Sequence, residues 1–200
     1  MTETSFRPFE THLDEGRALA VLREAVAGAE DGELFLERRR SELVSFDDGR
    51  LRTASYDSAE GFGLRAVAGP AAGYAHSTEL SESALKRAAE TARLAARAGG
   101  GTLDAAPAGT NRRLYGADDP VAERPLAEKI GLLAEIDAWL RARDPKVAQV
   151  SVTLAASLQE VEILRPEGLH VRDVRPLVRL NISVIAEGAD GRREQGSAGA

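Results

Sequence analysis

The chain has 200 residues, 43% of them hydrophobic, which is enough for one large domain or two small ones with a real apolar core. The net charge of −6 argues against a phosphate-binding surface, and therefore against nucleic acid as a partner. The absence of cysteine excludes a disulfide framework, a thiolate metal site and a cysteine nucleophile within these residues. No apolar run approaches the roughly 20 residues of a membrane span, and the N-terminus lacks a secretory signal. We therefore expect a cytoplasmic protein without a membrane partner.

The first third of the chain predicts a helix followed by a hairpin. Residues 1–12 are expected to form a loose lead-in, and residues 14–27 a helix with one apolar face that ends at Gly28. Residues 33–46 predict a strand whose polar run, 37–40, indicates a solvated face or a sheet edge. An Asp-Asp-Gly-Arg sequence then predicts a tight turn, because Asp-Gly supplies residues that tolerate positive φ, and residues 51–58 pair back.

Residues 60–97 predict the packing unit around which the chain is organised. Two short strands flank the Gly69-Pro70 turn, and Phe62, Leu64 and the alanines that follow alternate on one face. A long helix begins after Ser81, whose side chain is a good N-cap, and its alanines recur at helical spacing. The unit carries no evident chemistry of its own.

The second half of the chain repeats a helix-then-strands order. Residues 99–123 predict a long loop, and residues 125–143 a helix that starts with proline and ends before Asp144-Pro145. Separate short strands are expected over 147–156, 158–165, 169–174 and 177–187, with a return strand starting at 192.

These elements predict an α+β fold with antiparallel β-sheet covered by about three helices. Residues 1–98 are expected to form a first helix, β-meander and helix half, residues 99–124 a linker loop, and residues 125–200 a second helix and β-meander half. The two halves are expected to make one compact domain. A remote internal duplication would explain the layout, although no residue-level repeat is visible. We expect the chain to be a piece of a longer protein.

Only one stretch has a pattern that indicates a binding role. Residues 172–180 place arginines around Pro176, which is expected to break or bulge the strand, and Arg175 or Arg179 could then be aimed into a cleft. Arg65, on the face of its strand opposite Phe62 and Leu64 in the packing unit 60–97, is a third cleft candidate. An arginine fork suits carboxylates and peptide carbonyls, but a charged outer sheet face is the alternative explanation.

The histidines do not form a recognisable metal motif. His12, His76 and His170 lie far apart, and none has a partner at helical ligand spacing. We therefore assign no metal ligand and no catalytic residue to this chain, and expect it to bind no zinc by itself.

Three segments resemble one known family in the same order. They are GFGLRAVAGPAAGYAHSTELSESALKRAAETA, DVRPLVRLNISVIAE and GRREQGSAGA, and they are similar to the amino-terminal part of the TldD/PmbA family, first described as modulators of DNA gyrase. The VRPLVRL run is closer to the TldD branch.

The resemblance implies a parent protein about twice this length. In the TldD branch, zinc is held by an HExxxH helix and a later cysteine in a carboxy-terminal β-rich part, and the substrates are flexible or unfolded peptides. This chain contains neither feature, so none of those residues is carried over. The resemblance implies a scaffold and cleft-wall domain of a zinc metalloprotease, with a PmbA/TldE-like subunit or a second copy as partner. The alternative is a non-catalytic PmbA/TldE-like partner subunit that acts by protein–protein interaction.

Overall fold

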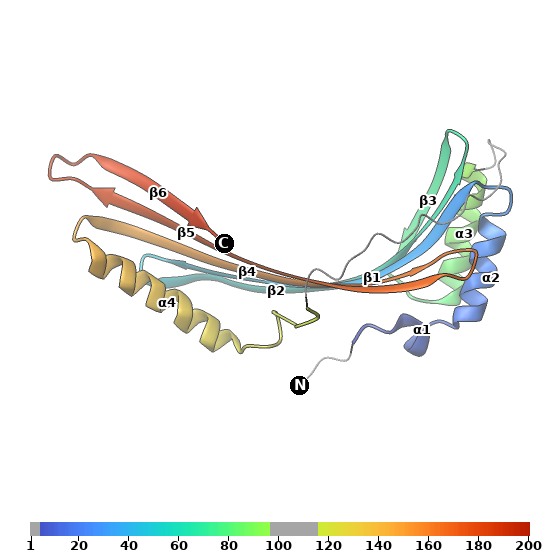
Figure 1. The fold of residues 1–200 in the computed structure, drawn as a ribbon, viewed down its shortest axis with the longest axis horizontal. Coiled ribbons are helices and arrows are strands. Elements are labelled where there is room, and N and C mark those ends of the chain that lie inside the picture. Colours follow the sequence, from blue (N-terminus) through green and yellow to red (C-terminus); the bar gives the residue numbers. More distant parts are fainter. Residues whose placement is uncertain (1–4, 97–115) are drawn as a thin grey trace.

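The structure is a computed structural model that describes residues 5–96 and 116–200, and these form a single curved sheet with helices at both ends (Figure 1). The elements in chain order are α1 (Pro8–Thr11), α2 (Glu15–Ala25), β1 (Asp31–Asp47), β2 (Arg50–Ala68), β3 (Ala71–Ser77), α3 (Glu82–Ala96), α4 (Leu126–Arg143), β4 (Val147–Leu164), β5 (His170–Glu187) and β6 (Arg193–Gly199). The six strands are all antiparallel to their neighbours, in the order β3-β2-β1-β4-β5-β6. The α+β prediction is therefore confirmed, although the predicted loose lead-in contains the short helix α1.

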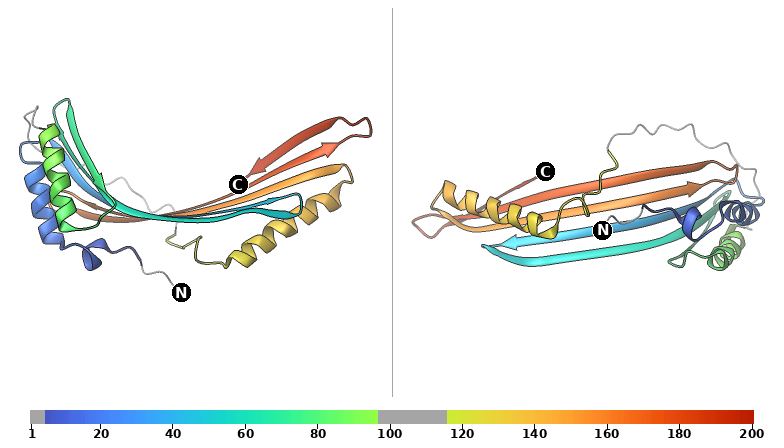
Figure 2. Two further views of the ribbon diagram at one scale, coloured as in Figure 1. Left: turned by 180° about the vertical axis from the view of Figure 1, so that it is seen from behind. Right: turned by 90° about the horizontal axis from the view of Figure 1, so that it is seen from below.

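The sheet has two different faces. Its four central strands have 17 to 19 residues each, so they reach about 60 Å at the usual rise per residue. The sheet bends along this length, and the described helices all lie on its convex face (Figures 1 and 2). The concave face carries none of the described helices.

The strands are longer than the sequence predicted. Each of the pairs 51–58 with 60–68, 147–156 with 158–165, and 169–174 with 177–187 is one continuous strand, so the prediction of separate short strands is wrong. A strand of this length crosses from one apolar core to the other. The pairing of β1 with both β2 and β4 keeps all three strands continuous through this middle.

The predicted break or bulge at Pro176 is also wrong, and the edge of the sheet explains why. The Leu180 N–H donates to the carbonyl of Ala200, on the β6 side of β5. Because alternate residues point their N–H groups to the same edge, the nitrogen of Pro176 faces this side too. β6 pairs with residues 181–187 only, so no described strand needs a donor from Pro176.

The first core lies under α2 and α3, as the sequence predicted. The apolar stripe of α3 is buried against Leu64 and its neighbours on β2, and Ser81 Oγ accepts the Ala84 N–H as an N-cap. Gly73 on β3 lets α3 approach closely, since an added Cβ would lie 2.0 Å from the carbonyl oxygen of Ala92. The turn at Asp48 and Gly49 has the predicted positive φ values, 51° and 75°.

The second core lies under α4 and is smaller. Leu133 is fully buried against Val44, Phe46 and residues of β4. Val178 on β5 and Trp139 on α4 lie outside this core, with exposed fractions of 52% and 56%.

The sheet order is symmetric about the β1–β4 pair. α2 is followed by strands of 17, 19 and 7 residues, and α4 by strands of 18, 18 and 7 residues, each set running outward from the centre. The predicted loop at 99–123 falls largely in residues 97–115, outside the described residues.

Candidate functional site

The register decides which side chains share the concave face. Arg39 of β1 pairs with Gln159 of β4, which pairs with Arg175 of β5, and Leu43, Ala155 and Arg179 form a second row. Residues opposite each other in antiparallel strands project to the same side. Since Leu36 and Val44 face the helices, these rows face away from them. Arg65 is in a row with Glu33, so all three predicted cleft residues lie on the concave face.

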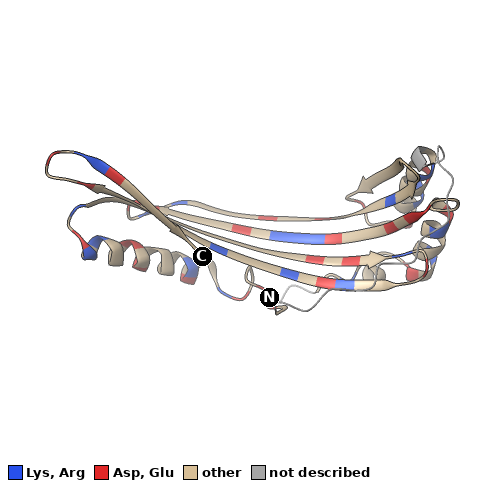
Figure 3. Ribbon diagram, turned by 45° about the horizontal axis from the view of Figure 1, so that its top comes forward, with Lys and Arg blue, Asp and Glu red and all other residues tan. Residues whose placement is uncertain are grey.

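Two hollows on the concave face meet at Arg179. One has a volume of about 650 Å³ over β4, β5 and β6, and its polar lining includes Ser151, Thr153 and Asn181. The other, about 250 Å³, is lined by side chains of β1, β2, β4 and β5, among them Arg39 and Asp57. Leu177 and Arg179 line both hollows. Charged positions recur along the middle stretches of the strands (Figure 3).

Arg179 is the predicted residue that best fits a binding role. Its Nε donates to Asn181 Oδ1 at 3.1 Å, and the side chain is exposed. Among the residues that the structure describes, no carboxylate lies within ion-pair distance of its guanidinium. Most of its donors therefore remain able to bind a carbonyl or carboxylate of a ligand.

Arg175 lies on the same strand as Arg179, about 13 Å away at the usual strand rise. Its Nε donates to Asp173 Oδ2 at 2.6 Å. Arg175 can therefore contact the same extended ligand as Arg179, but it starts from an ion pair that the ligand must share or replace.

Arg65 lies apart from the other two and is held by acidic residues. Its row is six residues along β1 from the Arg175 row, or about 20 Å. Arg65 binds Asp31 at 2.8 Å, and Asp31 also binds Arg165 at 2.7 Å. Burial raises the pKa of the Asp31 carboxyl, but the hydrogen bond and charge of Arg165, helped by Arg65, outweigh it and lower this pKa. Arg65 is better explained as part of this cluster of ion pairs around Asp31 than as part of the site at Arg179.

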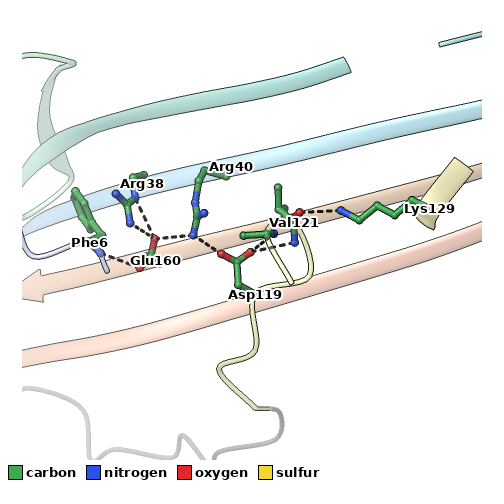
Figure 4. Close-up of polar contacts among 8 residues, drawn as sticks. Phe6, Arg38, Arg40, Asp119, Val121, Lys129 and Glu160 are labelled. Carbon is green, nitrogen blue, oxygen red and sulfur yellow. Dashed lines mark hydrogen bonds and ion pairs between the residues drawn. The ribbon is translucent and has the colours of Figure 1, made fainter. Parts of the chain in front are cut away.

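The convex face has a buried charged layer between the two cores (Figure 4). Glu160 Oε2 accepts two hydrogen bonds from Arg38, at 3.0 and 2.8 Å, and Glu160 Oε1 accepts the Phe6 N–H. Arg40 is 3% exposed and binds Asp119 at 2.9 Å. The polar run 37–40 is not at an edge, because β1 is a central strand, but it does have a solvated face: Arg39 is exposed on the concave side, whereas Arg38 and Arg40 are paired on the convex side.

The same layer fixes the segment before α4. Asp119 accepts the N–H groups of Val121 and Ala122, and Lys129 donates to the Val121 carbonyl at 2.8 Å. Lys129 also binds Glu42 on β1. These buried charges are matched, which is the condition for tolerating them in a core, and we assign them a structural role.

His170, at the start of β5, is a half-buried residue that bridges two carboxylates. Its Nε2 lies 2.7 Å from Glu162, and its Nδ1 3.3 Å from Glu15. His12 contacts Thr11, and His76 stacks on Tyr74. Within residues 5–96 and 116–200, no group of three or more histidine or acidic residues is arranged to hold a metal ion.

The sequence did not reveal Arg39, Asp57 or the serines and threonines that surround the hollows. They come from five strands, and only the register brings them together. The signal that could have found them is small polar residues at alternate positions, as at Ser151 and Thr153, opposite buried valines. That pattern predicts an open polar face but does not identify its neighbours.

A single sheet with helices on one face and an open polar face defines an α+β scaffold with a binding surface. Two family models match it: PmbA/TldA metallopeptidase domain 1 over residues 32–96, and the PmbA/TldA metallopeptidase central domain over residues 119–200. The matched ranges together cover more than half of the chain. The chain belongs to the PmbA/TldD metallopeptidase family, as its three sequence segments predicted.

Curated relatives support the same assignment. The chain is 33% identical over 171 residues to the metalloprotease TldD homolog of Haemophilus influenzae, and 28% identical over 169 residues to that of Buchnera aphidicola. Each match covers 84% of this chain and 35% of the relative. The chain thus spans about a third of the length of these relatives.

Solved structures share the fold at low sequence identity. A candidate modulator of DNA gyrase from Thermotoga maritima matches with a TM-score of 0.72 and 15% identity, over 92% of this chain and 41% of that one. One from Bacteroides thetaiotaomicron gives 0.67 and 14%, over 93% and 44%. TldE from Thermococcus kodakarensis gives 0.60 and 16%, over 90% and 42%. None of the helices among the described residues is long and apolar enough to cross a membrane.

Proposed function

We propose that the chain is the scaffold and one cleft wall of a TldD-type zinc metalloprotease that hydrolyses flexible or unfolded peptides. The observation that carries this proposal is the pair of hollows that meet at Arg179 on the concave face. An extended peptide presents carbonyls and carboxylates at regular spacing, and fixed arginine donors hold such groups well. The TldD homologs among the relatives support the protease assignment at family level.

The remaining parts of the proposal concern the longer protein. Zinc is the proposed metal, and no residue of this chain is assigned to it. The proposed partner is a PmbA/TldE-like subunit or a second copy, and the proposed location is the cytoplasm. The similarity in fold to TldE also fits the alternative that the parent is a non-catalytic partner subunit acting by protein–protein interaction.

The test is Arg179→Ala in the full-length protein. We expect kcat/KM on an unstructured, quencher-labelled peptide to fall about tenfold, because one charge-assisted contact to the peptide is lost. The free energy of unfolding should change by less than about 0.5 kcal/mol, since the side chain is exposed. Arg87→Ala is the control, because Arg87 is equally a surface arginine but lies on α3.

Three results would contradict the proposal. Unchanged turnover would remove Arg179 from the peptide site, and so would a loss fully matched by unfolding or an equal loss in Arg87→Ala. A zinc-loaded full-length protein without any turnover that still binds a partner subunit would instead favour the non-catalytic alternative.

A further inference from the structure

The helix α4 has its polar and apolar residues in unusual places. Two of the side chains on its inner face are charged: Lys129 and Asp137 are each 5% exposed. Lys129 binds Glu42, and Asp137 binds Arg141, which in turn binds Asp48 in the β1–β2 turn. These contacts anchor α4 to the sheet through both of its ends.

The outer face of α4 carries large apolar side chains among its charged residues, where a surface helix is normally polar. Leu132 is 47% exposed and Trp139, the only tryptophan of the chain, is 56% exposed. Glu128, Leu132, Glu135, Trp139 and Arg143 follow each other at spacings of three and four residues, so they form one stripe along the helix. In the first half of the chain, α2 packs beside α3; among the described residues, α4 has no helix beside it (Figure 1).

The stripe is complementary to itself when one copy is reversed. Its midpoint lies between Glu135 and the next residue, and Leu132 and Trp139 are equally distant from that midpoint on either side. Glu128 and Arg143 are also equally distant from it. A second copy running antiparallel therefore places Leu132 against Trp139 and Glu128 against Arg143, which is what a two-fold symmetric interface requires.

We propose that the outer face of α4 is an interaction surface whose partner is the same helix of a second copy of this chain. The apolar pair is desolvated at two symmetric positions, and the two Glu–Arg pairs at the ends set the antiparallel direction. Arg143 already lies 4.3 Å from the Trp139 ring, so its charge is held over the apolar contact. Association through α4 does not require peptide binding on the concave face, so either property can be absent without the other.

One residue of the stripe opposes the association. Glu135 lies next to the two-fold axis, where its carboxylate meets the same carboxylate of the second copy. The repulsion between these two neighbouring carboxylates weakens the contact between the helices. Because a single pair of helices also buries little surface, we expect a weak dimer, with a dissociation constant on the order of 10–100 µM.

The experiment is sedimentation of the 200-residue chain from roughly one-tenth to ten times that concentration, with Trp139 emission as a second readout. We expect dimer formation together with a blue shift of the emission, because the ring loses contact with water. Leu132→Glu should abolish both. Leu94→Glu is the matched control, since Leu94 is 63% exposed on α3 and lies outside the stripe.

Charge variants test the antiparallel register. Glu128→Lys and Arg143→Glu should each weaken the dimer about tenfold, and the double variant should recover most of that loss because the pairing is restored in reverse. Glu135→Gln should tighten the dimer several-fold. Circular dichroism checks that each variant keeps the helix content of the wild type.

The proposal is overturned by a chain that stays monomeric up to ten times the expected dissociation constant with native circular dichroism. It is equally overturned if Leu94→Glu disrupts the dimer as much as Leu132→Glu, or if the double charge variant is no better than either single one.

Discussion

The two halves of this sheet have the same layout but are stabilised differently. The first half is covered by α2 and α3, and its core is a continuous apolar cluster in which helix alanines pack closely on β2 and β3. The second half is covered by α4 alone, with a smaller core and charged residues among the inward-facing positions. The comparison shows that one topology can be held mainly by apolar burial at one end, and by less burial plus ion pairs at the other.

The largest expected loss of stability comes from truncating one buried leucine in each core. Leu85 and Leu133 are both fully buried, one under each helical cover. We expect Leu85→Ala to cost about 3–4 kcal/mol and Leu133→Ala about 2–3 kcal/mol, because a single helix can move into the cavity more easily than one wedged beside another. Urea unfolding of both variants measures this. An equal or larger cost for Leu133→Ala would show that the second core is as rigid as the first.

Replacing two glycines by alanine should change the free energy of unfolding in opposite directions at the two ends of the sheet. Gly73→Ala at the first end should destabilise the protein by about 2 kcal/mol, since the new methyl group meets the backbone of α3 and the helix must shift. Gly131→Ala in α4 has open space around the added Cβ, and should stabilise the protein by about 0.5–1 kcal/mol through helix propensity. Denaturant midpoints of the two variants provide the measurement. Destabilisation by Gly131→Ala would mean that α4 is less regular than described.

The smallest expected effect on stability comes from two carboxyl groups, Asp31 and Asp47, which lie at the two ends of β1. The pKa of Asp31 is lowered, against the effect of burial, by Arg165 and Arg65, whereas the pKa of Asp47 is lowered first by hydrogen bonds from Ser151 and Gln149. A carboxyl with a lowered folded-state pKa stabilises the fold above its unfolded pKa of about 3.9, and loses that contribution as the pH falls through the folded-state value. Asp31→Asn should therefore cost about 1 kcal/mol at pH 7, and this cost should begin to shrink near about pH 4 and vanish only below the lowered folded-state pKa.

High salt should distinguish how the two carboxyl groups contribute to stability. Because Asp31 is stabilised by charges and Asp47 mainly by neutral donors, 1 M salt should reduce the cost of Asp31→Asn more than that of Asp47→Asn. The measurement is the urea midpoint of each variant and of the wild type, at pH 7 and pH 3.5, with and without salt. A cost for Asp31→Asn that does not change with pH would show that its contribution is not ionic.

The sequence by itself determined the local elements and the family. Helical spacing located α2, α3 and α4, the Asp-Gly turn located the first hairpin, and alternation identified which residues at the end of β2 are buried. These predictions succeed because each depends only on residues that are close in the sequence, where the geometry of helices and strands is fixed. The three family segments are likewise read from consecutive residues.

The tertiary structure decided how far the strands extend and which side chains meet. Arg40 is buried only because Asp119 and Glu160 reach it from other parts of the chain, and Pro176 is tolerated only because its nitrogen faces the open side of β5. Arg179 and Asp57 come together through pairing across four strands. Such contacts depend on register between distant segments, which no local pattern in the sequence specifies.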